Sequence, residues 1–153
     1  MPTKLSRDFW LHEFTDSQEA SRRGITVTLP KELEANALRL FTDLVQPFRD
    51  FIKTPLIISS GYRPPWLNAA AGGAKNSRHM LALAIDCKAI GMTPLELCQA
   101  MVISRLPFDQ CIYEFGAWMH CGVAPDGEQP RGQVMWVAYE DRVPTYRAGL
   151  PKT

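Results

Sequence analysis

The chain has 153 residues, of which 46% are hydrophobic, and its 17 Lys and Arg residues nearly balance its 16 Asp and Glu residues. This size fits one globular domain, residues 1–153, with a hydrophobic core of its own. The near-zero net charge argues against a partner that is bound through charge alone, so we expect no nucleic-acid binding. No apolar stretch is long enough to predict a membrane span.

The N-terminal residues MPTKLSRDFWLHEF contain no apolar region of the kind found in secretion signals, so we expect a protein that is cytoplasmic as synthesised. We also expect a monomer. The cysteines lie inside apolar segments and form no C-x-x-C pair, which predicts reduced core thiols and no disulfide. They are Cys87, Cys98, Cys111 and Cys121.

Helices are predicted in the first third of the chain. The segment TDSQEASRRG indicates a short helix that is capped by Asp16 or Ser17 and ended by Gly24. A longer helix is predicted from Pro30, because the apolar residues after it recur at spacings of three and four and form one buried stripe. Pro47 lies inside this pattern and should kink the helix, since proline has no N–H to donate.

Short strands dominate the rest of the pattern. PLIIS, residues 55–59, predicts a buried strand, and the long, turn-rich segment SGYRPPWLNAAAGGAKNSR follows it. Next come a strand in ALAIDCKA and a helix in TPLELCQAMVIS, with Thr93 as its cap and Pro94 at its first position.

The last predicted elements are a hairpin, in which FGA joins the strands DQCIYE and WMHCGV, and a final strand in QVMWVAY. The remaining residues indicate a surface tail, so the core should span about residues 9–138 and the tail residues 139–153. Together these elements predict a single α+β domain, with N-terminal helices packed on a small, mostly antiparallel sheet.

Candidate metal ligands lie at the ends of these elements. His120 is in the middle of WMHCGV, where alternation places it on the opposite face from Cys121. Alternation in LAIDCKA lets Asp86 point out of the same sheet face, toward the long loop that ends in His79. Two imidazoles and one carboxylate with an open fourth position are typical of catalytic zinc. From spacing alone an alternative to a metal site remains, in which the histidine is a core residue that is hydrogen-bonded within the protein and binds no metal.

The motifs around these residues resemble those of the zinc D-Ala-D-Ala metallopeptidase superfamily, which has the hedgehog/DD-peptidase fold. The shared features are the SGYR loop, the GGA turn, an S-x-H-x-x-G-x-A-x-D block and a W-x-H strand, found here from about Phe9 to the end of WMHCGV. Within the superfamily, the motifs resemble those of the small, often phage-encoded peptidoglycan peptidases. The resemblance implies Zn²⁺ held by His79, Asp86 and His120. Ala82 replaces the usual glycine of the block, and we expect only a small effect on backbone packing.

Hydrolysis by zinc-activated water also needs a carboxylate that accepts and passes on a proton. Glu114 is our candidate, because in the predicted hairpin it lies on the same face as Trp118 and His120. Other members of the superfamily carry the acidic base three residues before the last histidine, where this chain has Ala117. The alternative for Glu114 is a solvated acid of the hairpin.

Three further residues are predicted to contact the substrate. In the superfamily the arginine of SGYR lies near the scissile bond, which implies a catalytic and substrate-binding role for Arg63; the alternative is a salt bridge that anchors the loop. Ser77 is expected to contact substrate or, alternatively, to bond the backbone of its own turn. Trp118 is expected to bind substrate from the metal face.

The resemblance implies a zinc-dependent metallopeptidase that acts on the peptide stems of peptidoglycan, either as a D-Ala-D-Ala carboxypeptidase or as an endopeptidase. The small size favours a phage lysin (endolysin) that reaches the cell wall when the host lysis machinery releases it. A bacterial cytoplasmic dipeptidase or recycling enzyme is the alternative source of the same activity. Two alternatives of another class also remain at this point. One is a binding module of the same fold, stabilised by zinc but not catalytic, and the other is a virion-associated structural protein.

Overall fold

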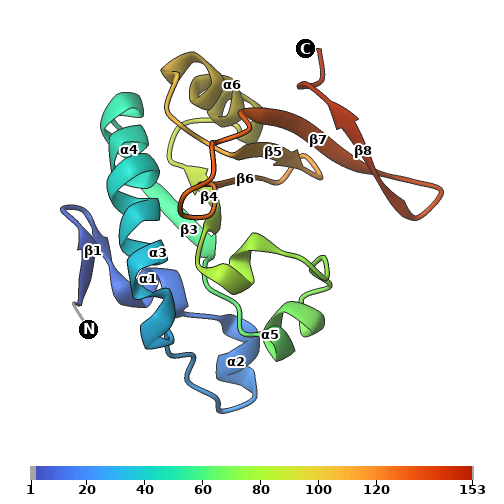
Figure 1. Ribbon diagram of the computed structural model, residues 1–153. Helices are drawn as coiled ribbons and strands as arrows, with labels where there is room; N and C mark the ends of the chain where they lie inside the picture. Colours follow the sequence, from blue (N-terminus) through green and yellow to red (C-terminus); the bar gives the residue numbers. More distant parts are fainter. Residues whose placement is uncertain (1–2, 153) are drawn as a thin grey trace.

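The computed structural model describes residues 3–152, and its centre is a six-stranded sheet with the strand order β3-β4-β6-β5-β7-β8 (Figure 1). Within these residues, only β5 and β7 pair in parallel, and the other neighbouring pairs of this sheet are antiparallel. This confirms the predicted α+β fold with a mostly antiparallel sheet. The strands are β3 Leu56–Ser60, β4 Ala84–Ala89, β5 Gln110–Glu114, β6 Trp118–Gly122, β7 Gln133–Glu140 and β8 Val143–Ala148.

Two short strands and a short helix that the sequence did not indicate come first. Strands β1 (Lys4–Ser6) and β2 (Phe9–Trp10) form a ribbon that leads into α1 (Leu11–Thr15). The predicted short helix is α2 (Gln18–Arg22), and Ser17 is its cap, because the Ser17 side chain accepts a hydrogen bond from the Ala20 N–H.

The long helix predicted after Pro30 consists of four consecutive helical segments. They are the 3₁₀ turn η1 Lys31–Leu33, α3 Glu34–Leu40, the π-helical turn η2 Phe41–Val45 and α4 Gln46–Ile52. The π turn lies directly before Pro47, and in it the Gln46 N–H donates to the Phe41 carbonyl, five residues back. Instead of a simple kink at Pro47, the helix therefore has a wider π turn before the proline, in which the backbone hydrogen bonds shift by one residue.

Helix α6 (Pro94–Ser104) begins as predicted, with a capping box between Thr93 and Glu96. It packs with α4 and with strands β4, β5 and β6, so the helices cover one face of the sheet and enclose the core. All four cysteines are free and buried, as predicted. Among residues 3–152, no helix combines the length and apolar character needed to cross a membrane. The largest fully buried side chains include Phe9, Phe14, Leu40, Phe41, Leu44, Phe48, Leu97, Met101 and Met119.

Two predictions about loops were wrong. The long connection after β3 contains a helix, α5 (Pro65–Ala70), which begins at a proline because its first N–H needs no intrahelical partner. The predicted tail forms the end of β7 and the whole of β8, which pair as a hairpin that projects from the body of the protein (Figure 1). Asp141 and Arg142 form its two-residue turn with positive φ angles of 49° and 66°, and this turn lacks the glycine that usually signals such hairpins.

Candidate metal centre and active-site cleft

Strands β4 and β6 hold two of the predicted metal ligands side by side. Asp86 pairs with His120 in the antiparallel register, so both side chains leave the same face of the sheet. The adjacent Cys87 and Cys121 point into the core, as alternation predicts. The third ligand, His79, comes from the 3₁₀ turn η3 (Arg78–Leu81), which directly precedes β4.

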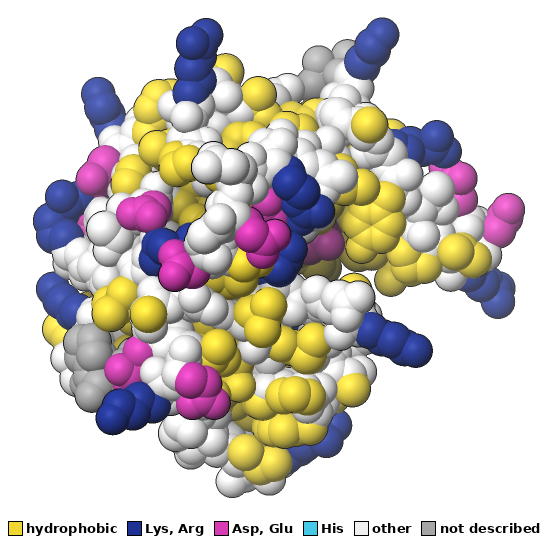
Figure 2. Space-filling view, in the orientation of Figure 1, with side chains coloured by type: hydrophobic (Ala, Val, Ile, Leu, Met, Phe, Trp, Pro, Cys, Tyr) yellow, Lys and Arg dark blue, Asp and Glu magenta, His cyan; other side chains and the backbone are white. Residues whose placement is uncertain are grey.

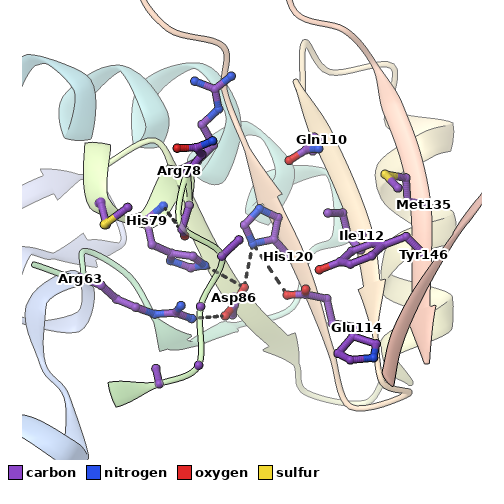
Figure 3. Close-up of a pocket in the computed structure, with 18 of the residues that line it drawn as sticks. Arg63, Arg78, His79, Asp86, Gln110, Ile112, Glu114, His120, Met135 and Tyr146 are labelled. Carbon is purple, nitrogen blue, oxygen red and sulfur yellow. Dashed lines mark hydrogen bonds and ion pairs between the residues drawn. The ribbon is translucent and has the colours of Figure 1, made fainter. Parts of the chain in front are cut away.

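These three side chains meet at one buried point (Figure 3). Oδ1 of Asp86 lies 3.2 Å from Nε2 of His79 and 3.0 Å from Nδ1 of His120. The exposed fractions are 2% for His79, 4% for Asp86 and 8% for His120. One donor atom from each residue lies within 4.8 Å of the others, and no other such group of three occurs among residues 3–152. The structure thus brings the predicted ligands together.

The SGYR loop orients His79. The Nδ1–H of His79 donates to the Gly61 carbonyl at 2.8 Å, which leaves the Nε2 lone pair available to bind a metal ion on the side of Asp86. Gly61 itself lies against α1, where the Tyr62 N–H donates to the Phe14 carbonyl. A Cβ at Gly61 would stand 2.1 Å from that carbonyl oxygen, so only glycine fits. The glycine of the motif therefore positions a metal ligand that lies far away in sequence.

Arg63 holds the other oxygen of Asp86. Its Nη2 donates to Oδ2 of Asp86 at 3.0 Å, while Nε and Nη1 donate to the side chains of Ser60 and Asn68. The salt-bridge alternative is thus what the structure shows, and it ties the loop to the metal centre. Gly73 of the GGA turn packs against this group, since a Cβ there would stand 2.1 Å from Oδ1 of Asn68.

The protonation states of the three candidate ligands follow from burial and from one another. Burial lowers the pKa of His79 below its usual value, despite the nearby Asp86. Burial alone would raise the pKa of the Asp86 carboxyl, but the two histidines outweigh it and hold that pKa well below its usual range. For His120, the hydrogen bond with Asp86 outweighs burial and raises the pKa.

This donor set fits zinc. A neutral imidazole and an ionised carboxylate are the forms that bind metals, and His120 would release a proton on binding. Two nitrogen donors and one carboxylate leave a fourth position open, which is typical of catalytic zinc, whereas structural zinc is usually closed by four ligands. A site that combines His120 with Cys121 is excluded, because the Cys121 side chain is buried on the opposite face.

Glu114 lies beside this centre at the end of β5. It pairs with Trp118 across the hairpin, and the Trp118 indole N–H donates to Oε1 of Glu114 at 2.9 Å. The same oxygen lies 3.9 Å from Nδ1 of His120. Burial raises the pKa of the Glu114 carboxyl, although His120 opposes the shift. Glu114 is therefore a partly buried acid on the same sheet face as the metal ligands, as strand alternation predicted. Ala117, where other members of the superfamily carry the acidic base, lies in the turn between β5 and β6.

Ser77 and Ala82 flank η3. The Ser77 hydroxyl accepts a hydrogen bond from the His79 N–H and so caps the turn that carries this ligand, which is the alternative expected from the sequence. Ala82 ends the turn with a φ of 57°, a left-handed conformation that costs an alanine roughly 1–2 kcal/mol. The glycine usual at this place would avoid that cost, so the effect of Ala82 on the backbone is larger than expected.

A cleft of about 1050 Å³ opens over the metal centre. Its floor carries the metal ligands and Glu114, one wall is the loop of residues 71–81, and the predicted substrate contacts Arg63, Ser77 and Trp118 all line it. The opposite wall comes from the β7–β8 hairpin, and Figure 2 shows the hollow between this projecting arm and the rest of the molecule. The hairpin wall was missed from the sequence. Its residues are Met135, Tyr139, Pro144 and Tyr146.

Comparison with known proteins agrees with this site. None of the curated proteins compared matches the chain. A family model described as peptidase M15 matches residues 7–122, which include His79, Asp86, Glu114 and His120 and end with β6. The match covers most of the chain and nearly the same residues as the motifs. The protein therefore belongs to the peptidase M15 family, within the superfamily of zinc D-Ala-D-Ala peptidases.

Proposed function

We propose that the protein is a zinc-dependent peptidase that hydrolyses the peptide stems of bacterial peptidoglycan. It acts either by removing the terminal D-Ala or by cutting inside the stem as a lysis enzyme. The observation that carries the proposal is the convergence of His79, Asp86 and His120 beside Glu114 at the floor of one open cleft. Membership of the peptidase M15 family supports the reaction class.

In this proposal each side chain at the cleft floor has a separate task. His79, Asp86 and His120 would hold zinc, a Lewis acid that lowers the pKa of water and polarises a carbonyl group. Glu114 accepts the proton of the attacking water and passes it to the leaving amine. Burial raises the pKa of Glu114, which makes it a stronger base, and the Trp118 indole fixes its orientation.

Arg63 is proposed to contact the substrate as well as Asp86. A guanidinium has five N–H groups, and three of them are used by Ser60, Asn68 and Asp86. Those that remain can donate to a substrate carboxylate or to the oxyanion that forms on attack. Arg63 lines the cleft, so this role requires no large movement of its side chain.

The proposal is tested by incubating zinc-loaded protein with purified peptidoglycan, with and without chelator, and identifying the released products by mass spectrometry. Release of D-Ala would indicate a carboxypeptidase, and release of longer fragments an endopeptidase. We expect Glu114→Gln to retain zinc and to lower kcat by a factor of about 10²–10⁴. Glu32→Gln, at an exposed carboxylate outside the cleft, is the matched control and should behave as wild type.

A binding module without catalysis is the second candidate, and Ala117 favours it, because the superfamily's acidic base is missing there. If zinc-loaded protein released nothing from peptidoglycan but still bound it, this candidate would replace the first. Hydrolysis that survives Glu114→Gln at the wild-type rate would show that Glu114 is not the base.

A further inference from the structure

The hairpin wall of the cleft lies outside the residues that carry the family match. The match ends at residue 122, whereas β7 and β8 span residues 133–148. The sheet nevertheless continues from β5 through β7 to β8, so that Glu114 pairs with Val137 and Val137 with Tyr146. Because paired residues share a face, Tyr146 stands on the same side of the sheet as the candidate base.

Tyr146 points from this wall toward the metal centre. Figure 3 shows its ring below Met135, with the hydroxyl pointing toward the side of the cleft where His120 and Glu114 lie. Burial and the Glu114 charge both raise the pKa of the phenol, so it is protonated at neutral pH and available as a donor. Within residues 3–152 this hydroxyl makes no hydrogen bond of its own.

The wall presents two exposed aromatic rings to the cleft. Tyr139 is 65% exposed and Tyr146 51% exposed, although both face the cleft. The Tyr139 ring stacks on Phe115 with a centroid distance of 4.6 Å, and Phe115 in turn contacts Trp118 at 5.9 Å. These rings form a continuous edge from the hairpin to the residue that orients Glu114. Exposed aromatic surface that borders a cleft is typical of a binding site.

The opposite wall differs in character. It is the turn-rich loop of residues 71–81, which carries the cations Lys75 and Arg78 and, at its end, the apolar side chains of Met80 and Leu81. No salt bridge involves either of these cations within residues 3–152. An extended peptide in the cleft would therefore face a loop with two cations on one side and the aromatic rings of the hairpin on the other.

We propose that the β7–β8 hairpin is a substrate-binding wall of this enzyme. The rings of Tyr139 and Tyr146 pack against the backbone and short aliphatic side chains of the bound peptide, and the Tyr146 hydroxyl donates a hydrogen bond to a peptide carbonyl near the scissile bond. This inference rests on the proposed peptidase function, and it assigns substrate recognition to residues beyond the family match.

Steady-state kinetics of the zinc-loaded full chain on a soluble stem pentapeptide test this wall. We expect Tyr146→Ala and Tyr139→Ala each to lower kcat/KM about tenfold, mainly through KM, because they remove packing surface. Tyr146→Phe removes only the hydroxyl and should lower kcat/KM about fivefold. The matched control is Val143→Ala, at a β8 residue that is exposed and does not line the cleft, and it should leave the kinetics unchanged.

Wild-type kinetics in all three tyrosine variants would overturn the inference. If the wild-type protein itself fails to hydrolyse the pentapeptide, the proposed function fails, and the wall is then tested by binding. In that case the quenching of tryptophan fluorescence by the pentapeptide measures affinity. A tenfold weaker affinity of Tyr146→Ala would support the wall, and an unchanged affinity would overturn it.

Discussion

The metal centre and the hairpin wall face the same cleft but are held in different ways. The three candidate metal ligands are buried, and two of them are held by a further group, the Gly61 carbonyl on His79 and Arg63 on Asp86. The cleft residues of the hairpin are exposed, apart from the half-buried Met135, and depend on the pairing of β7 with β5. The family match includes the first region and ends before the second. The buried groups hold the metal ligands in one geometry. Substitutions in the exposed hairpin can therefore alter contacts with a bound peptide without moving these ligands.

The largest effect is expected from removing a metal ligand. His120→Ala leaves two donors and takes away a partner of the buried Asp86, so zinc affinity should fall by more than about hundredfold and hydrolysis should be lost. Metal analysis of the purified protein, together with Tm with and without chelator, checks this. His12→Ala is the control, because His12 is exposed outside the cleft. Unchanged zinc content in His120→Ala would rule out the site.

Gly61→Ala tests how far zinc affinity depends on the carbonyl group that orients His79. The added Cβ would stand 2.1 Å from the Phe14 carbonyl oxygen, so the loop must shift, at a cost of about 1–3 kcal/mol in the free energy of unfolding. The shift also moves the carbonyl that orients His79, and zinc affinity should fall about 10- to 100-fold.

Gly72→Ala is the matched control for this glycine. At Gly72 a Cβ meets nothing within 4 Å, and only the positive φ of 71° resists an alanine. We expect a loss of about 1–2 kcal/mol in stability, with zinc affinity unchanged. Isothermal titration with Zn²⁺ separates the two variants, and equal affinities would show that the Gly61 carbonyl does not position His79.

The metal centre could be predicted from the sequence because its residues obey strand alternation. Asp86 and His120 point away from the core for the same reason that Cys87 and Cys121 point into it. The cap at Thr93 and the β5–β6 hairpin were predicted because their signals are local. These features need only neighbouring residues to be recognised.

Other features depend on contacts that the sequence does not display. The hydrogen bond from His79 to the Gly61 carbonyl joins residues that only the folded chain brings together. The β7–β8 hairpin was missed because its turn is formed by Asp141 and Arg142, and an arginine rarely adopts the left-handed conformation that glycine usually supplies at the second place, so the usual Asn-Gly or Asp-Gly signal is missing. Parallel pairing of β5 with β7 has no local signal either.

A smaller effect on stability is expected from the ion pair that connects the start of β5 to the start of β7. Asp109, just before β5, accepts hydrogen bonds from the backbone and guanidinium of Arg131, just before β7. Burial would raise the pKa of Asp109, but Arg131 outweighs it and lowers that pKa below the usual 3.8. Because the pKa is lowered by folding, the stabilisation is present above the unfolded value and is lost as pH falls through the folded one.

Asp109→Asn should therefore lower the free energy of unfolding by about 1–2 kcal/mol at pH 7, since Arg131 is half exposed. The difference from wild type should shrink as the pH falls below about 3.8. Urea unfolding at pH 7 and at pH 3 measures it, with Asp126→Asn as the control at an exposed aspartate. A difference that is the same at both pH values would show that the charge of Asp109 does not hold the hairpin to the sheet.

The smallest effect is expected at the tip of the hairpin, and it tests directly whether the two regions are independent. Arg142 has a φ of 66° in a two-residue turn that favours glycine, so Arg142→Gly should stabilise the hairpin by about 0.5–1 kcal/mol. Native-state hydrogen exchange should then slow in β7 and β8, and both strands should still exchange faster than β4 and β6, because an arm can open alone whereas core strands open only with the whole domain. Equal free energies of exchange in all four strands would mean that arm and centre unfold as one unit, and changes in the hairpin would then disturb the metal centre as well.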